Sequence, residues 1–301
     1  MIKDNIRNKP FFGIGLALFG ALIITPDTLL IRLSGLDGWG LTISRGALIG
    51  ITLLSIWLFI SRRDIETEFK NAMSIPFLLL LLSSGTSNIS FNFATTETQI
   101  TVVLSTLATM PIMAAILSII ILQEKPTSLT WLAVFFCFIG VLIVIFNAQA
   151  PINNPSGNIF LGGLFSLISA FGLSLFFILS RKYQNTPIIF AVALGNLISC
   201  LVGFMVSPDS SIFGGNIIPI LLMGIVVMPT ALICLAFAPR YTSATNVSLL
   251  VLLEMILGPF WVWMGTGEQP NLMVFYGAVL VLFTLLTYFY LTSKKLATLK
   301  T

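Results

Sequence analysis

Three ionisable side chains stand out because each lies inside a long apolar run: Asp27, Arg45 and Glu254. Charged groups at membrane depth are costly, and where they occur they are candidates for binding or ion coupling. A carboxylate can bind a proton or a cation, and a guanidinium can bind a carboxylate. The chain has no histidine, which excludes histidine proton relays, histidine–metal sites and Ser-His or Cys-His catalysis.

The depths of these residues predict which of them pair. On an outward-running helix, Asp27 lies about 25 Å from the helix start, and on the next helix Arg45 lies about 10 Å below the outer surface. Glu254 lies about 18 Å along its helix, near the midplane. We expect Arg45 to pair with Asp27, which leaves Glu254 to bind a proton or a substrate cation. The alternatives are a static clasp for the pair and structural hydrogen bonding for Glu254.

Buried amides form a second group of candidates. Asn88 and Asn92 are four positions apart, so a helix places both on one face. Asn246 lies in another apolar run. The predicted set of substrate-binding or coupling residues is Asp27, Arg45, Asn88, Asn92, Asn246 and Glu254. For any single amide the alternative is hydrogen bonding between helices, worth about 0.6 kcal/mol on average in membranes.

The composition shows what kind of protein must position these groups. The 301 residues are 57% hydrophobic and 9% charged, with a mean hydropathy of +1.03. A soluble domain has roughly a quarter charged residues, so an all-α polytopic membrane protein is predicted. The chain contains no Walker A or H-E-x-x-H motif, and no enzyme, metal site or cofactor is expected. Its three cysteines lie in apolar runs and predict no disulfide framework.

Runs of about 20 mainly apolar residues predict ten membrane-spanning helices. Alternating the loops between two sides puts thirteen basic residues on one side and Arg32 alone on the other. The positive-inside rule then places both termini in the cytoplasm. Pro26, Pro111, Pro229 and Pro259 are expected to interrupt or kink four of the helices. The expected helices are 10–32, 38–60, 74–95, 98–121, 128–147, 158–180, 187–207, 216–238, 242–264 and 271–292.

A charge-free stretch divides the helices five and five. It predicts a first repeat over 1–147, an external linker over 148–157 and a second repeat over 158–301. Because each half has an odd number of helices, the second repeat must be inverted in the membrane. Inverted repeats around a midplane site are a common design of secondary transporters.

Matching positions in the two halves support this division. An offset of 144 aligns residues 91–111 with 235–255, and it also aligns Glu124 with Glu268 and Pro126 with Pro270. We expect the two glutamates to act as helix caps or gate anchors rather than as substrate ligands. An offset of 149 aligns Arg32 with Arg181.

These motifs resemble the EamA-type ten-helix transporters of the drug/metabolite transporter superfamily, over nearly the whole chain. Glu124, Glu268, Gly277 and Pro111 match the family pattern, and Glu254 matches a glutamate that often precedes a proline. Met255 replaces that proline, and Ala133 stands where the family often has glycine. The resemblance implies a metabolite transporter, usually an exporter, whose helices line a central cavity.

We therefore expect an exporter or exchanger that moves a small polar or amphipathic metabolite, such as an amino acid or related compound, by alternating access. Arg45 would bind a substrate carboxylate, and Glu254 or Asp27 an ammonium. The alternatives are a translocase or scramblase of lipids or hydrophobic compounds, and a multidrug-type cation exporter. The expected partners are the substrate, membrane lipid and protons as coupling ion, with no nucleic acid. The chain is expected as a monomer or homodimer in the bacterial cytoplasmic (inner) membrane.

Overall fold

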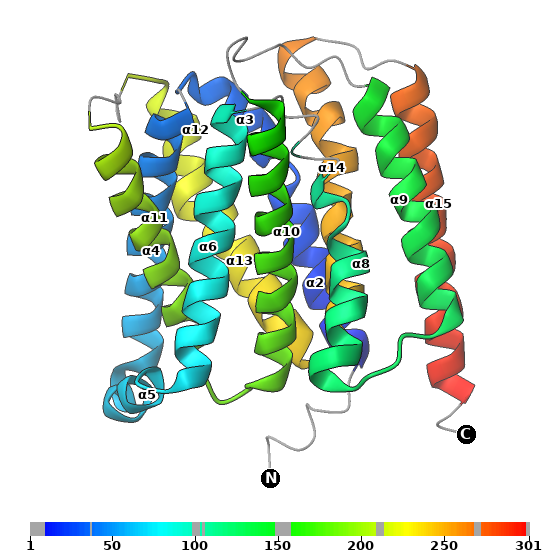
Figure 1. Cartoon of the computed structure of the whole chain (residues 1–301), viewed down its shortest axis with the longest axis horizontal. Helices are drawn as coiled ribbons and strands as arrows, with labels where there is room; N and C mark the ends of the chain where they lie inside the picture. Colours follow the sequence, from blue (N-terminus) through cyan, green and yellow to red (C-terminus); the bar gives the residue numbers. More distant parts are fainter. Residues whose placement is uncertain are drawn as a thin grey trace.

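The computed structural model describes residues 10–36, 38–97, 103, 106–147, 158–208, 214–267 and 272–298. The elements in this part of the chain are helices packed side by side in a bundle (Figure 1). Eight of them are long and apolar enough to cross a membrane, and two shorter apolar helices cover Met110–Leu122 and Ser128–Ile143. The all-helical prediction is confirmed, whereas the count of ten spans stays a prediction.

The first half of the chain follows the predicted boundaries closely. The expected helix over 10–32 is two helices, and the described part of the expected helix over 98–121 is α8 followed by a π-helical segment. Residues 98–102, 104 and 105 lie outside the described part. The helices are α2 (Pro10–Ile24), α3 (Asp27–Ser34), α4 (Gly38–Ile60), α5 (Ile65–Ala72), α6 (Ile75–Glu97), α8 (Met110–Leu117), the π-helical segment (Ser118–Leu122) and α9 (Ser128–Asn147).

The second half has the same kinds of element. Its helices are α10 (Ile159–Lys182), α11 (Ile188–Val206), α12 (Ile217–Leu221), a π-helical segment (Leu222–Val227), α13 (Met228–Phe237), α14 (Ala244–Thr266) and α15 (Leu272–Thr298). The predicted linker over 148–157 and Glu268 lie outside the described residues. Pro229 stands at the start of α13, directly after the π-helical segment. Helix α14 continues through Pro259, so the expected interruption there is not a break in the helix.

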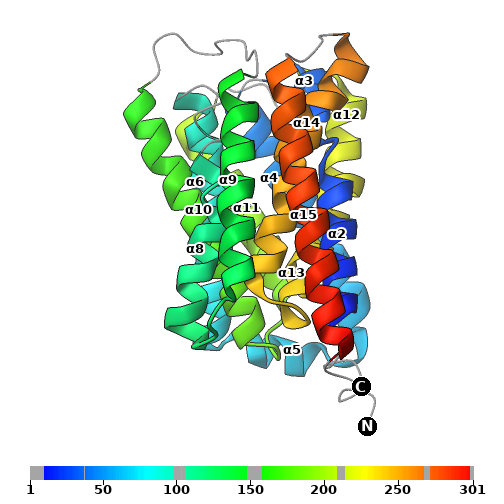
Figure 2. The same cartoon turned by 90° about the vertical axis from the view of Figure 1, so that its right-hand side faces the viewer.

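Neighbouring helices come from opposite halves of the chain. Helix α4 packs on α11, α6 on α10, α2 on α13, and α9 on α15. Helix α14 contacts both α2 and α8. Helices α9 and α15 lie side by side, at the right-hand edge of the bundle in Figure 1 and in the foreground in Figure 2. The beginning of α2 and the end of α15 lie at the same end of the bundle (Figure 1).

Apolar side chains cover the outside of the bundle as well as its core. Phe59, Phe160 and Phe283 are exposed, together with many Leu and Ile side chains. Small residues allow the closest contacts inside: a Cβ on Gly195 would lie 3.0 Å from Ser84 Oγ and 3.2 Å from the Gly85 nitrogen. Apolar outer faces with small residues between helices are typical of proteins packed in a bilayer.

Candidate functional site

A break in the first helix places Asp27. Pro26 has no N–H to donate, and its ring crowds the carbonyl one turn back, so α2 ends at Ile24 and α3 begins at Asp27. The backbone N–H and the hydroxyl of Thr25 both donate to the Leu22 carbonyl, at 3.3 and 2.8 Å. Asp27 is therefore the first residue of a helix, where the partial positive charge of the N-terminus favours a carboxylate.

Asp27 and Arg45 form the ion pair expected from their depths. Arg45 Nη2 lies 3.0 Å from Asp27 Oδ2, and the two residues are 8% and 3% exposed. Beside Arg45, Gly46 lets α4 lie against the backbone of α11. A Cβ on Gly46 would stand 2.8 Å from Asn196 O and Cys200 N. Close packing of α4 on α11 therefore fixes the position of Arg45.

This ion pair leaves one polar atom on each partner without a hydrogen bond. Asp27 Oδ1 and Arg45 Nη1 are buried and have no partner within the described residues. A buried polar group left in this state costs about 1–3 kcal/mol, and more when it is charged. Both residues line a central cavity of about 170 Å³. The pair thus offers one acceptor and one donor to a ligand in that cavity.

Glu254 brings a third charge to the central cavity from α14. It lines the same cavity as Asp27 and Arg45. One turn after Glu254 on α14, helix α3 packs closely on α14. A Cβ on Gly258 would lie 2.9 Å from Thr28 Oγ1 there. Within the described residues Glu254 has no ion pair or hydrogen bond. The described charges lining the cavity are therefore two carboxylates and one guanidinium.

The three predicted amides do not gather at one place. Asn88 lines the central cavity. Asn92 instead donates from Nδ2 to Ser199 Oγ at 3.3 Å, joining α6 to α11. Residues four apart share a helix face but are separated by about 6 Å along the axis, so the two side chains meet different neighbours.

Asn246 lies nearer the end of the bundle where α15 ends. Its Nδ2 donates to Thr242 Oγ1 at 2.9 Å, and the Tyr288 hydroxyl donates to its Oδ1 at 2.7 Å. Asn92 and Asn246 thus take part in hydrogen bonds between side chains, and neither is among the residues that line the central cavity. The structure brings together Asp27, Arg45, Asn88 and Glu254.

Sequence reasoning predicted Asn88 but missed the residues around it on the same face of α6. Ser84, Ser87, Asn88 and Phe91 all line the central cavity, and their spacing of i, i+3, i+4 and i+7 places them on one helix face. Ser87 Oγ also donates to the Ser169 carbonyl at 2.9 Å, which joins α6 to α10. The spacing was visible in the sequence, but small hydroxyl residues are common in membrane helices.

Much of the remaining cavity wall is apolar. Helix α10 contributes Leu173, Phe176 and Phe177, while α8 and the residues before it contribute Met110 and Leu107. A few polar groups on a mainly apolar wall are typical of small-molecule sites, because the apolar surface supplies affinity and the polar groups fix orientation. The central cavity is therefore suited to an amphipathic ligand.

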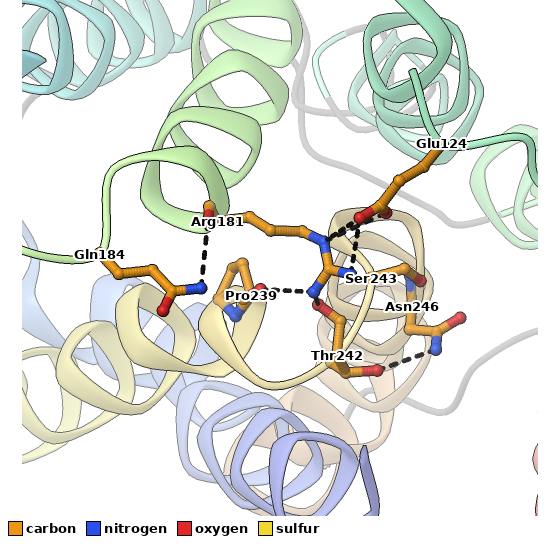
Figure 3. A network of polar contacts seen from close by, with 7 residues as sticks. All are labelled: Glu124, Arg181, Gln184, Pro239, Thr242, Ser243 and Asn246. Carbon is orange, nitrogen blue, oxygen red and sulfur yellow. Dashed lines mark hydrogen bonds and ion pairs between the residues drawn. The ribbon is translucent and has the colours of Figure 1, made fainter. Parts of the chain in front are cut away.

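A second polar cluster, drawn in Figure 3, joins three elements. It lies at the end of α10, which is also the end of the bundle where α15 ends (Figure 1). Arg181, near the end of α10, donates from Nε to both carboxylate oxygens of Glu124, at 2.9 and 3.1 Å, and from Nη2 to Oε1 at 2.8 Å. Its Nη1 donates to the carbonyls of Thr242 and Pro239, at 2.7 and 3.2 Å. We call these four residues the Arg181 clasp. The clasp connects the segment after α8 to the turn before α14.

Comparison with known proteins shows what the chain is similar to. Residues 11–146 match the EamA-like transporter family. This match covers just under half of the chain and, with the transporter names of two relatives, supports a member of the drug/metabolite transporter superfamily. This EamA-like chain is thus a multi-pass membrane transporter, and transporters are usually not enzymes.

Two relatives carry transporter names. An "uncharacterized transporter" of Clostridium kluyveri is 27% identical over 213 residues, which cover 67% of this chain and 67% of that protein. The "uncharacterized transporter YdfC" of Bacillus subtilis is 24% identical over 255 residues, which cover 82% of this chain and 81% of that protein. A solved crystal structure aligns with a TM-score of 0.77 over 95% of this chain and 99% of its own, at 11% sequence identity. That likeness shows a shared fold.

Proposed function

We propose that this EamA-like chain is a secondary transporter that moves a small amphipathic metabolite, such as an amino acid, by alternating access. The observation that carries the proposal is the central cavity, where charges of both signs face a largely apolar wall. Such a cavity fits a molecule with a carboxylate, an ammonium and an apolar side chain.

The unpartnered atoms define how such a substrate would bind. Arg45 Nη1 donates to the substrate carboxylate, while Asp27 Oδ1 or the Glu254 carboxylate accepts from the ammonium. Asn88, which has no hydrogen bond within the described residues, supplies a further donor and acceptor. The volume of about 170 Å³ is below the range of roughly 300–1,000 Å³ that is usual for drug-sized ligands. The size therefore favours a metabolite over a large drug.

The charge imbalance also supports coupling to protons. Two carboxylates and one guanidinium line the cavity, and an uncompensated charge in a low-dielectric site is costly. A proton on Glu254 balances the cavity, and a zwitterionic amino acid leaves that balance unchanged because it carries one ammonium and one carboxylate. A substrate with a net positive charge would instead take the place of the proton, so exchange against a proton is expected for such a substrate.

Alternating access would come from two inverted five-helix repeats, residues 1–147 and 158–301, with ten membrane spans. The packing supports this proposal, since the helix contacts join opposite halves of the chain. The thirteen basic residues predicted for one side support a cytoplasmic location for both termini. The two bacterial relatives favour the bacterial cytoplasmic membrane as the location.

Counterflow in proteoliposomes tests the proposal. Vesicles loaded with one unlabelled amino acid at a time would be diluted into the same labelled compound, across the common amino acids. The expected result is saturable uptake that depends on the internal compound. Conductive flux without saturation, or no exchange of any amino acid, would contradict it.

A small organic cation is a second candidate substrate, because the Glu254 carboxylate has no partner within the described residues. The same vesicles can be tested with tetramethylammonium, which has no carboxylate for Arg45. Exchange of tetramethylammonium at the expense of amino acids would favour the cation. Flipping of a fluorescent phospholipid in these vesicles would favour a scramblase.

A further inference from the structure

A second cavity, which we call the end cavity, lies at the end of the bundle where α15 ends. It has a volume of about 630 Å³ and shares no lining residue with the central cavity. Eight of its twelve lining residues carry a hydroxyl group, contributed by the segment 118–130, by the start of α14 and by the end of α15. A polar cavity of this size, in a chain that is 57% hydrophobic, calls for an explanation.

A packed wall separates the two cavities. Helix α14 lines both, with Thr245 at the end cavity and Val251 at the central cavity, which are about 9 Å apart along the helix. Between them Val247 is fully buried and Leu250 is 2% exposed. The end cavity is thus a separate site rather than an extension of the central one.

Two hydroxyl groups in the end cavity are open to a ligand. Ser118 and Thr245 are each 2% exposed and line the cavity, and neither side chain makes a hydrogen bond within the described residues. Their neighbours Thr130 and Tyr288 are instead bonded to each other at 3.1 Å. Neither hydroxyl oxygen is among the fully buried polar atoms that lack a partner. Both residues line the cavity, so Ser118 and Thr245 can donate to a ligand that enters it.

The electrostatics of the end cavity favour an anion. Its one lining carboxylate, Glu124, is already paired with Arg181. Lys125 lines the cavity and has no ion pair within the described residues. Helices α9 and α14 begin at the cavity, at Ser128 and Ala244, and helix N-termini carry partial positive charge. One free ammonium and two helix N-termini face no unpaired carboxylate among the lining residues.

We propose that the end cavity is an oxyanion-binding site, where Ser118 and Thr245 donate hydrogen bonds to a carboxylate or phosphate group and Lys125 supplies the charge. The group can belong to a free solute or to a phospholipid headgroup. This site goes beyond the proposed function, because binding there can be measured without transport. The net charge available to a ligand in the end cavity is positive, whereas in the central cavity carboxylates are in excess.

Thermal unfolding of the purified chain in an uncharged detergent tests this site. Sodium phosphate or sodium acetate would be titrated against sodium chloride at equal ionic strength. A ligand that binds the folded state raises the Tm in a saturable way. Lys125→Gln and Thr245→Val should each weaken the apparent affinity by roughly fivefold or more, as expected for charged hydrogen bonds.

Two matched variants serve as controls. Lys182→Gln removes a charge at the same end of the bundle, from a residue that does not line the cavity. Ser248→Ala removes a hydroxyl from the same helix as Thr245, one that bonds its own backbone at the Thr245 carbonyl. Both should keep the wild-type affinity. An equal rise in Tm with chloride, or equal affinities in all four variants, would overturn the proposal.

A lipid arm identifies the source of the group. Dihexanoyl-phosphatidylglycerol would be compared with inorganic phosphate at equal concentration. If the lipid raises the Tm more than phosphate does, and Lys125→Gln abolishes the difference, the ligand is a headgroup. If phosphate alone suffices and the lipid adds nothing, the ligand is a free anion. A failure of either arm leaves the counterflow result untouched.

Discussion

At the scale of single residues, Asp27 is the partner that allows Arg45 to be buried. Asp27→Asn would leave the guanidinium without its ion pair, and breaking a buried pair in this way costs about 3–5 kcal/mol. We expect a large fall in the Tm of the purified chain. The double exchange Asp27→Arg with Arg45→Asp should restore part of the lost Tm, because it remakes an ion pair. The recovery should be incomplete, since the N-terminus of α3 disfavours a cation at position 27. An unchanged Tm in Asp27→Asn would contradict the pair's importance.

Removing the charge of Glu254 should affect transport rather than stability. Glu254→Gln removes a charge that has no partner within the described residues, so the free energy of unfolding should stay the same or rise. Transport and its dependence on pH should both fall, because the residue no longer exchanges a proton for a cation. Counterflow at several pH values measures this. Glu97→Gln, at the end of α6, is the control that should transport as the wild type does.

At the scale of helices, Gly46 sets how closely α4 approaches α11. Gly46→Ala would place a Cβ 2.8 Å from two backbone atoms of α11, which cannot yield as a flexible side chain can. We expect a loss of about 1–3 kcal/mol, the usual cost of overpacking, measured as a lower Tm. Gly15→Ala is the matched control, since nothing lies within 4 Å of the added Cβ. An equal effect in both variants would exclude the clash.

The sequence could predict helix boundaries because apolar length and helix breakers act locally. The helices expected over 38–60 and 128–147 coincide with α4 and α9. The Asp27–Arg45 pair was also predictable. The two residues lie on adjacent helices, and the constant rise per residue of a helix gives the depth of each in the membrane. Asn92 and the end cavity were not predictable, since they depend on how α6 meets α11 and how α8 meets α14. Such contacts between distant segments leave no periodic signal in the sequence.

At the scale of the whole molecule, the packing has the pattern that two related halves require. If α2 corresponds to α10, α6 to α13 and α8 to α14, then the contact of α2 with α13 corresponds to that of α10 with α6. The contact of α2 with α14 likewise corresponds to that of α10 with α8, and all four contacts are present. This pattern supports the proposed inverted repeats, which could exchange inward and outward access by rocking.

The Arg181 clasp would then hold one end of the bundle closed. Arg181→Gln removes its bonds to Glu124 and to the turn before α14, so access to the central cavity from that end should increase. A cysteine at the cavity, Asn88→Cys, reports this access to a membrane-impermeant thiol reagent. The native Cys137, Cys200 and Cys234 are buried and should react slowly.

Labelling of Asn88→Cys from the side of the clasp should rise about fivefold when Arg181→Gln is added, as a shift of about 1 kcal/mol in the equilibrium would produce. Lys182→Gln, one residue further along α10, changes charge at the same place but leaves the clasp intact. It should label like Asn88→Cys alone. Equal labelling in the two combined variants would mean that the clasp stabilises the fold without controlling access. A rise specific to Arg181→Gln would make Arg181 a residue that governs the conformational equilibrium of the transporter.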